Sequence, residues 1–399
     1  MSNLIALFGP GHRANSIRGR ARLRRHTPEF ERLAERVLLS AGVTNTGLGA
    51  PLASQAAPQF ARVGVSSMSA TSVNNQPADF VIDKFGNVYY DAFQNGSWTG
   101  WLPVVVPAGA KQISAVAVNG APGVFILNGV GQVYFAFSVD NGAHWNPSFV
   151  VSTVTAISAT SVGGQPAVFV VNSVKDVHYF ASTNGGITWA IASEVNRSGT
   201  VASVSATSVS GTPAVFMLTA TKDVFYAAST NNGATWGIGS VVNNSGTVAS
   251  ISSASLGREP AVFLRTTAKD VYYAASLNGG DTWGIGSLVN GSATVAAISA
   301  VAVAGKPAVF MRTSGKAVYY AASTNGGDTW GIGSAVLQGG GITSISALSI
   351  SSSPAVFLAN SVGKVYYANT PNGGDSWNFA ALIGGSPSVL IGGRKRGRS

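Results

Sequence analysis

One unit is repeated seven times between about residues 67 and 385, and this repetition constrains the fold more than any other feature. The most regular marker is a Pro-x-x-Phe motif whose successive copies lie 45, 44 and then four times 47 residues apart. A unit of this size cannot bury its own apolar face, so neighbouring copies must pack on one another. Seven copies of a β-rich unit therefore predict a closed ring. The motif occurs at Pro77/Phe80, Pro122/Phe125, Pro166/Phe169, Pro213/Phe216, Pro260/Phe263, Pro307/Phe310 and Pro354/Phe357.

The copy at residues 295–340 shows what one unit contains. Small residues at 298–303 indicate a first strand, the runs 307–311 and 317–322 indicate two more, and a fourth lies near 332–336. Turn residues such as Gly305 and Gly315 separate them. Four short antiparallel strands per unit are typical of a propeller blade. We therefore predict an all-β fold, a seven-bladed β-propeller of four-stranded antiparallel blades, with the small Ser and Ala of each first strand near the crowded ring axis.

An aromatic pair recurs on the predicted third strand of every unit. Adjacent residues of a strand point to opposite faces of the sheet, so each blade presents one ring to each neighbouring blade. Core packing is the simplest role for these rings, and a ladder of sugar-stacking platforms is the alternative. The pairs are Tyr89/Tyr90, Tyr134/Phe135, Tyr179/Phe180, Phe225/Tyr226, Tyr272/Tyr273, Tyr319/Tyr320 and Tyr366/Tyr367.

Composition excludes several classes of protein and site. Hydrophobic residues make up 46% of the 399 residues and charged residues only 10%, which does not fit a disordered body. The absence of cysteine excludes disulfides and thiolate metal sites. The four histidines are not spaced as zinc ligands, and no apolar run reaches the roughly 18 residues of a membrane helix. We therefore expect no metal site, no cofactor and no transmembrane span.

The net charge of +10 is concentrated at the two ends of the chain. Residues 1–42 contain eight Arg and three Glu, and residues 394–399 contain four basic residues and no acidic one. The part between them carries 13 Lys and Arg against 12 Asp and Glu. A nucleic-acid function would have to depend on the ends alone, so we expect no specific nucleic-acid partner.

Residues 1–42 differ from the repeats and form a basic segment with one predicted short helix. Thr27 can cap a helix that starts at Pro28, and apolar residues at helical spacing extend it to about Leu39. The run FERLAERVLLS at residues 30–40 resembles an N-terminal signature of many exported or surface proteins from one bacterial lineage with a complex cell envelope, although Ala34 stands where that signature usually has Glu. The resemblance implies export or surface sorting. The alternative is a basic helix with no sorting role.

The remaining boundaries follow from composition and from the repeat. Residues 43–63 are rich in Gly, Ala, Pro, Ser and Gln and are predicted to be a linker. Residues 392–399 are predicted to be a disordered basic tail. The predicted propeller spans 64–391, with repeats near 64–108, 109–153, 154–199, 200–246, 247–293, 294–340 and 341–385.

A turn motif precedes the last strand in six of the seven units, and the first unit has only a degenerate version at residues 93–98. It resembles the Asp-box, S-x-D-x-G-x-T-W, of sialidase-like β-propellers, with Asn replacing Asp in five copies. The resemblance implies a structural role: the Asp or Asn side chain holds the turn, Gly accepts a positive φ, and Trp buries a large ring. The predicted structural residues are Asp140, Trp145, Asn184, Trp189, Asn231, Trp236, Asn278, Trp283, Asn325, Trp330, Asn372 and Trp377.

The connections between blades carry the candidate ligand residues. In a four-stranded blade, the first-to-second and third-to-fourth turns lie on one face, and the other connections lie on the opposite face. The resemblance to sialidase-like propellers implies a ligand site on this second face, near the ring axis. The candidates there are Lys175, Asp176, Lys222, Asp223, Lys269, Asp270, Arg197, Arg265 and Arg312.

No catalytic residues are predicted. A sialidase needs three convergent arginines, a Tyr nucleophile paired with a Glu, and an Asp acid/base, and the repeats show no positioned carboxylate pair. The glycines belong to turns and do not form a phosphate-binding loop. A hydrolase would require Arg197, Arg265 and Arg312 to point into one pocket.

The sequence therefore favours a secreted or cell-surface, non-catalytic binding protein that takes carbohydrate, as a lectin does, through the repeated loops of the second face. Several similar weak sites would combine into high avidity. A surface protein–protein scaffold or assembly factor is the first alternative, and a sialidase-like glycoside hydrolase is the second. The expected partners are glycans or a surface protein, and the expected state is a monomer.

Overall fold

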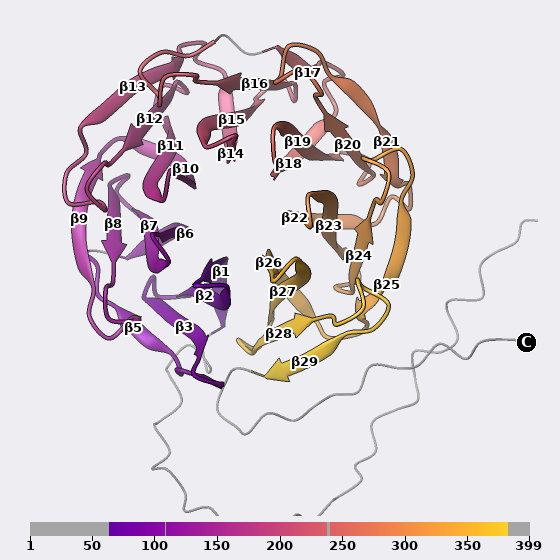
Figure 1. Ribbon diagram of the computed structural model, residues 1–399, viewed down its shortest axis with the longest axis horizontal. Helices are drawn as coiled ribbons and strands as arrows, with labels where there is room; N and C mark the ends of the chain where they lie inside the picture. The colour runs from indigo at the N-terminus through magenta and orange to yellow at the C-terminus, as the bar shows by residue number, and fades with distance from the viewer. Residues whose placement is uncertain (1–63, 108, 238–239, 382–399) are drawn as a thin grey trace, which may run out of the picture. The chain divides into compact units, whose positions relative to one another are not determined.

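The computed structural model describes residues 64–381, apart from residues 108, 238 and 239, and in this part seven antiparallel sheets form a ring (Figure 1). Each sheet is built from consecutive strands, with the first strand toward the centre and the last toward the rim. The predicted all-β propeller of seven blades is confirmed, and the described residues contain no helix. Blade 1 departs slightly, because a short fifth strand pairs with its third.

The first four blades run from residue 65 to residue 243. Blades 1 and 2 consist of β1 (Val65–Val73), β2 (Gln76–Asp83), β3 (Val88–Gln94), β4 (Ser97–Trp98), β5 (Leu102–Val104), β6 (Ala110–Val118), β7 (Ala121–Asn128), β8 (Val133–Phe137) and β9 (Asn146–Val151). Blades 3 and 4 consist of β10 (Val154–Val162), β11 (Gln165–Asn172), β12 (Val177–Ala181), β13 (Ile191–Asn196), β14 (Val201–Val209), β15 (Thr212–Thr219), β16 (Val224–Ala228) and β17 (Val241–Asn243).

The last three blades complete the ring. They consist of β18 (Val248–Leu256), β19 (Glu259–Thr266), β20 (Val271–Ala275), β21 (Gly284–Asn290), β22 (Val295–Val303), β23 (Lys306–Thr313), β24 (Val318–Ala322), β25 (Gly331–Leu337), β26 (Ile342–Ile350), β27 (Ser353–Asn360), β28 (Val365–Asn369) and β29 (Asn378–Ala381). The predicted helix at 28–39, the export-like signature, the linker 43–63 and the tail 392–399 lie outside the described residues.

Serines of the innermost strands link each blade to the next, which adds a chemical reason to the steric one for small residues there. The hydroxyl of Ser299 accepts the backbone N–H of Ala347 from the following blade at 2.9 Å. The same bond recurs at all seven seams, and the one from Ala70 of blade 1 to Ser346 of blade 7 closes the ring at 2.8 Å. The other accepting serines are Ser69, Ser114, Ser158, Ser205 and Ser252.

A second seam contact is aromatic. The Phe of each Pro-x-x-Phe motif and a third-strand ring pack against the Trp of the next blade, as Phe216 and Tyr226 do against Trp283 at centroid distances of 5.4 and 5.2 Å. At the closing seam Trp98 takes this place, 5.8 Å from Phe357 and 5.4 Å from Tyr367. The degenerate turn of blade 1 therefore still supplies the ring that joins it to blade 7.

The register corrects one predicted aromatic pair. Phe169 lies opposite Tyr179, and Val170 lies opposite His178, as Phe216 and Met217 lie opposite Tyr226 and Phe225 in blade 4. The pair of blade 3 is therefore His178/Tyr179, and the predicted Tyr179/Phe180 was shifted by one residue. His178 takes the half-buried position that Phe or Tyr occupies elsewhere. The prediction that these rings pack in the core is confirmed for the second member of each pair, which is buried in every blade.

Candidate functional site

The two faces of the ring carry different turns. We call the face with the first-to-second and third-to-fourth turns the box face, since it holds the Asp-box-like turns. We call the other the lysine face, defined by the turns 172–176, 219–223, 266–270 and 313–317 and by the connections between blades.

On the box face, the predicted structural residues make the hydrogen bonds that hold the turns. In blade 5, the side-chain oxygen of Asn278 accepts the N–H of Thr282 at 3.0 Å, and the hydroxyl of Ser276 accepts the N–H of Gly280 at 2.8 Å. Asp140 accepts the N–H and faces the ring of His144, and these bonds lower the pKa of its carboxyl to about 2. The same pattern recurs at Asn184, Asn231, Asn325 and Asn372.

On the lysine face, four lysines lie at the tips of the turns between second and third strands in blades 3 to 6. In blade 5, the N–H of Lys269 donates to the carbonyl of Thr266, and the N–H of Thr266 donates to the carbonyl of Asp270, both at 2.9 Å. This is a type I turn followed by a bulge residue with positive φ, a position that usually holds glycine. The lysines are exposed and have φ of 65° to 71°: Lys175, Lys222, Lys269 and Lys316.

The aspartates that follow three of these lysines hold the loops of the same face. One carboxylate oxygen of Asp270 accepts the N–H of Ala293 at 3.1 Å, from the connection between blades 5 and 6. Asp176 and Asp223 make the equivalent bond to Gly199 and Gly246 at 3.0 and 3.1 Å. Because the three aspartates lie in three different blades, they do not form a pair of carboxylates at one site.

The connections themselves repeat an Asn-x-Ser-x-Thr pattern with the same internal bonds. The side-chain oxygen of Asn243 accepts both the N–H of Ser245 at 3.0 Å and its hydroxyl at 2.7 Å, and that hydroxyl also lies 2.7 Å from the hydroxyl of Thr247. Equivalent bonds occur at Asn290-Ser292-Thr294, and in part at Asn196-Ser198-Thr200. The amide nitrogen of Asn243 forms none of these bonds and is available to a ligand.

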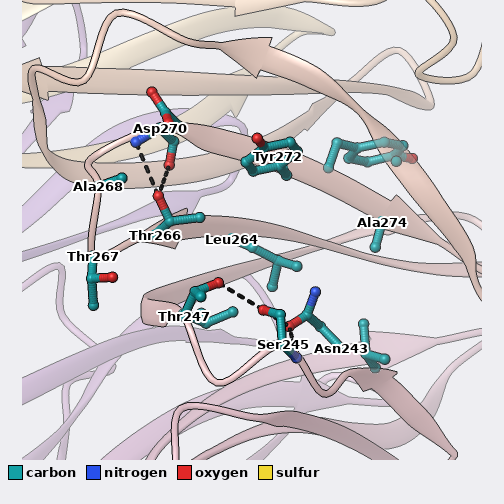
Figure 2. A pocket seen from close by; sticks show the side chains of 14 residues that line it. Asn243, Ser245, Thr247, Leu264, Thr266, Thr267, Ala268, Asp270, Tyr272 and Ala274 are labelled. Atoms are coloured by element: carbon teal, nitrogen blue, oxygen red, sulfur yellow. Dashed lines mark hydrogen bonds between the residues drawn. The ribbon is translucent and has the colours of Figure 1, made fainter.

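A pocket of about 370 Å³ lies on this face between blades 4 and 5 (Figure 2). Blade 4 supplies the polar connection, with Asn243, Ser245 and Thr247, and blade 5 supplies the aromatic ring of Tyr272 and the carboxylate of Asp270. Apolar side chains complete the lining. Of the sequence-predicted ligand residues, Asp270 lines this pocket, and Lys269 lies beside it in the same turn.

The three predicted arginines are not brought together. Arg197 forms an ion pair with Glu194, 3.3 Å between Nε and Oε2, beside the rim strand of blade 3. Arg265 and Arg312 lie on the second strands of blades 5 and 6, close enough for the charge of Arg265 to act on Arg312. Burial first, and then repulsion by Arg265, lowers the pKa of Arg312. The arrangement of three convergent arginines that a hydrolase would need is therefore absent from these positions.

Two carboxyls that the sequence reasoning overlooked lie in the core of blade 1. Asp79 and Asp91 are cross-strand partners and both are fully buried. Desolvation raises the pKa of Asp79 well above its usual value and that of Asp91 to about 7, and the neighbouring carboxyl raises that of Asp79 further. The signal was present in the repeat, because the other six units carry Val at the position of Asp79. Their burial excludes contact with a ligand in this structure.

Within the described residues, no group of three or more His, Asp or Glu side chains is arranged to hold a metal ion. A search of the same residues for a helix long and apolar enough to cross a membrane found none.

Comparison with known proteins adds a likeness of fold. No family model matches this chain, and no curated protein matches it. Among solved structures, an ulvan lyase (a polysaccharide lyase bound to a GlcA(1-4)Rha3S chain) has a TM-score of 0.55 at 13% identity, covering 81% of this chain and 96% of its own. The SapL1 lectin bound to α-methyl fucoside has a TM-score of 0.49 at 16% identity, covering 71% and 100%. A fucose-recognising lectin of Aleuria aurantia, a six-bladed propeller, has a TM-score of 0.48 at 17% identity, covering 68% and 95%.

Proposed function

We propose that this protein is a non-catalytic carbohydrate-binding protein that acts outside the cytoplasm and binds glycans on its lysine face. The observation that carries the proposal is the pocket between blades 4 and 5. Its volume of about 370 Å³ is within the range of roughly 300 to 1,000 Å³ that small-ligand sites occupy. One ring and several polar groups converge there, which suits a sugar, since a sugar presents both an apolar C–H face and hydroxyls.

The polar groups of the pocket have bonding capacity left for a ligand. The amide nitrogen of Asn243 can donate two hydrogen bonds, and the hydroxyl of Thr267 can both donate and accept. The half-buried ring of Tyr272 offers a flat apolar surface beside them. A saccharide hydroxyl therefore finds donors and acceptors at fixed positions on two blades.

Repetition supports binding at more than one site. The connections after blades 3, 4 and 5 share the Asn-x-Ser-x-Thr pattern, and blades 3 to 6 share the turn with an exposed lysine. Several similar sites on one rigid ring favour avidity for a repeating ligand such as a glycan chain. The likeness to the ulvan lyase is one of fold alone, and that structure holds a saccharide chain.

The non-catalytic part of the proposal rests on the accessible carboxylates of the lysine face. Asp176, Asp223 and Asp270 each use one oxygen to hold a loop, and they lie in separate blades. Glycoside hydrolysis generally uses two carboxyl groups on opposite sides of one glycosidic bond. The extracytoplasmic part rests on the signature-like run at residues 30–40.

The test is a glycan array probed with the full chain, followed by competition with the free sugar and titration calorimetry. A glycan that binds saturably and is displaced by free sugar is the expected result. Silence across the array overturns the proposal and directs the search to protein partners. A variant locates the site: Ala268→Phe should fill the pocket and weaken binding there by at least tenfold, while the fold tolerates it because blade 1 carries Phe85 at the same turn position.

The matched control is Val130→Phe. It places the same ring at the same turn position in blade 2, where the native Val130 is already 74% exposed. Binding by this variant should equal that of the unmodified protein. Equal binding by Ala268→Phe would place the glycan elsewhere on the ring.

A further inference from the structure

The four lysines of the lysine face occupy a backbone conformation that disfavours them. Blades 1, 2 and 7 carry glycine at the same position, with φ of 82° to 85°. A side chain with a Cβ atom is strained at positive φ, and lysine has none of the local hydrogen bonding that eases it for Asn or Asp. Four consecutive blades nevertheless carry lysine there, and strained residues of this kind concentrate at functional sites. The glycines are Gly86, Gly131 and Gly363.

The ammonium groups of these lysines are not used within the described part of the fold. None of the four forms an ion pair there, and Lys269 alone has a recorded side-chain bond, 3.2 Å from Nζ to the hydroxyl of Ser314 in blade 6. Three of the lysines are followed by an aspartate, but no lysine–aspartate ion pair forms in the described part of the fold; the carboxylate of Asp223, for example, accepts the N–H of Gly246 and the hydroxyl of Thr221. Four exposed ammonium groups on this face therefore lack an ion-pair partner among the described residues.

A second, independent observation lies closer to the axis. Arg265 and Arg312 are half-buried on adjacent blades, repel each other, and have no carboxylate partner among the described residues. Nε of Arg265 donates to the hydroxyl of Ser250 at 3.0 Å, whereas Nε of Arg312 is buried without a hydrogen-bond partner. Guanidinium groups pair strongly with sulfate, phosphate and carboxylate oxygens. Two guanidinium groups that can still form hydrogen bonds and ion pairs favour an anionic ligand on the same face.

The box face has the opposite character. Its turns expose Asp281, Asp328 and Asp375 against two cations, Arg258 and Lys306, so the excess of basic side chains in the described ring lies on the lysine face. The basic side thus coincides with the side that holds the pocket. That side presents one exposed lysine in each of four neighbouring blades.

We infer that the lysine face of blades 3 to 6 selects anionic glycans, meaning polysaccharides that carry sulfate or uronate groups along the chain. This inference rests on the proposed function and names its ligand class. The pocket contacts a sugar ring, the arginines contact an anionic group near the axis, and the four lysines contact anionic groups at successive positions. Long, flexible lysine side chains tolerate variable sulfate positions, and one charge per blade matches a polymer with repeated charges.

A nucleic acid is the competing polyanion, and the lysine face fits it less well. Proteins that bind single strands stack successive bases on exposed aromatic rings. In the described part of blades 3 to 6, the aromatic side chains are half-buried or buried, so none forms an open platform. A sugar in the pocket needs only the half-buried ring of Tyr272 and no run of exposed rings.

The experiment compares full-length protein on three immobilised probes: dextran, dextran sulfate of the same length, and a single-stranded DNA of similar charge. The test variant is Lys175→Gly/Lys222→Gly/Lys269→Gly/Lys316→Gly, which gives these turns the residue that blades 1, 2 and 7 already have. The control variant is Lys306→Ser, which removes a lysine from the box face and introduces the residue of blade 7, Ser353. Both variants keep the terminal basic segments, so any difference comes from the ring.

We expect dextran sulfate to bind at least tenfold more tightly than dextran, with an affinity that falls as salt rises. The fourfold variant should lose at least tenfold on dextran sulfate, and the control variant should lose nothing. The inference is overturned if the fourfold variant binds dextran sulfate as tightly as the unmodified protein, or if DNA binds more tightly with the same lysine dependence. Equal binding of dextran and dextran sulfate overturns anion selection alone, whereas a protein that binds neither these probes nor any array glycan overturns the proposed function.

Discussion

The buried carboxyl pair of blade 1 yields a prediction opposite in sign to the usual effect of acid. The perturbation is Asp79→Val/Asp91→Ala, which restores the residues that blades 2, 4, 5, 6 and 7 carry at these two positions. Both aspartates are fully buried, and Asp79 forms no side-chain hydrogen bond of normal geometry, although the N–H of Phe80 slightly lowers its pKa. Asp91 accepts one hydroxyl, from Thr99 at 3.0 Å.

The magnitude follows from linkage. The pKa of Asp91 is raised from 3.8 to about 7 in the folded protein. Well below pH 4 the carboxyl of Asp91 is protonated in both states and adds no pH dependence; between about pH 4 and pH 7 it is ionised in the unfolded chain but not in the folded one. The free energy of unfolding therefore falls as pH rises, by about 1.4 kcal/mol per pH unit and on the order of 4 kcal/mol in all for Asp91. Asp79 adds to the effect in the same direction.

The assay is urea denaturation followed by tryptophan fluorescence at pH 4.5 and pH 7.5. The unmodified protein should be less stable at pH 7.5 by at least roughly 3 kcal/mol, the share of Asp91 alone, and the double variant should lose most of this difference. Thr99 loses its acceptor, yet its hydroxyl still accepts the N–H of Ala92 at 3.1 Å, so little is lost in return. Asp281→Asn, which changes an exposed turn, is the control and should keep the slope of the unmodified protein. An unmodified protein equally stable at both pH values, or a double variant with the same slope, refutes the reasoning.

Two further predictions concern backbone strain and ring closure. Each substitution Lys175→Gly, Lys222→Gly, Lys269→Gly or Lys316→Gly should raise the unfolding free energy by up to about 1 kcal/mol, because it relieves a side chain at positive φ; a urea midpoint that falls for all four contradicts the left-handed geometry. Trp98→Ala should cost about 3 kcal/mol, since its ring is the contact of blade 1 with Phe357 and Tyr367 at the closing seam. Thermal denaturation measures it, and a shift no larger than that of the exposed Val130→Ala would show that the serine bonds and apolar contacts close the ring without the tryptophan.

The ring could be predicted from the sequence because each structural position occurs seven times. A buried Phe in every copy and a Ser or Ala at every innermost strand define their environments without any structure. The hydrogen bonds of the box turns follow in the same way, because an Asn or Asp four residues before Thr, Ser or His suffices to hold the turn. Positions that carry the same residue type in every copy also have the same geometry in every blade.

Single departures from the repeat were harder to predict. His178 replaces an aromatic ring, and the sequence pattern then favoured Phe180 as the second ring, one residue away from the true register. Asp79 and Asp91 stand where the other copies have apolar residues. The repeat pattern does not show which side chains surround the pair, so their burial was not predicted. The pocket lies between two blades, so the sequence of one unit does not predict it. Tyr272 lines the pocket and Tyr273 is buried, and since both are tyrosines the residue type alone does not tell them apart.

Comparing the seven copies also separates the role of the box face, which is to hold turns, from that of the lysine face. On the box face, the repeated side chains hydrogen-bond within their own turns, as Asn278 does with Thr282, so repetition there is explained by folding. On the lysine face, glycine would satisfy the turn at Lys269 with less strain, and blades 1, 2 and 7 have it. The fold therefore explains the turn but not the choice of lysine. Because four blades carry lysine in a backbone conformation that disfavours it, these lysines are the strongest candidates for ligand contact.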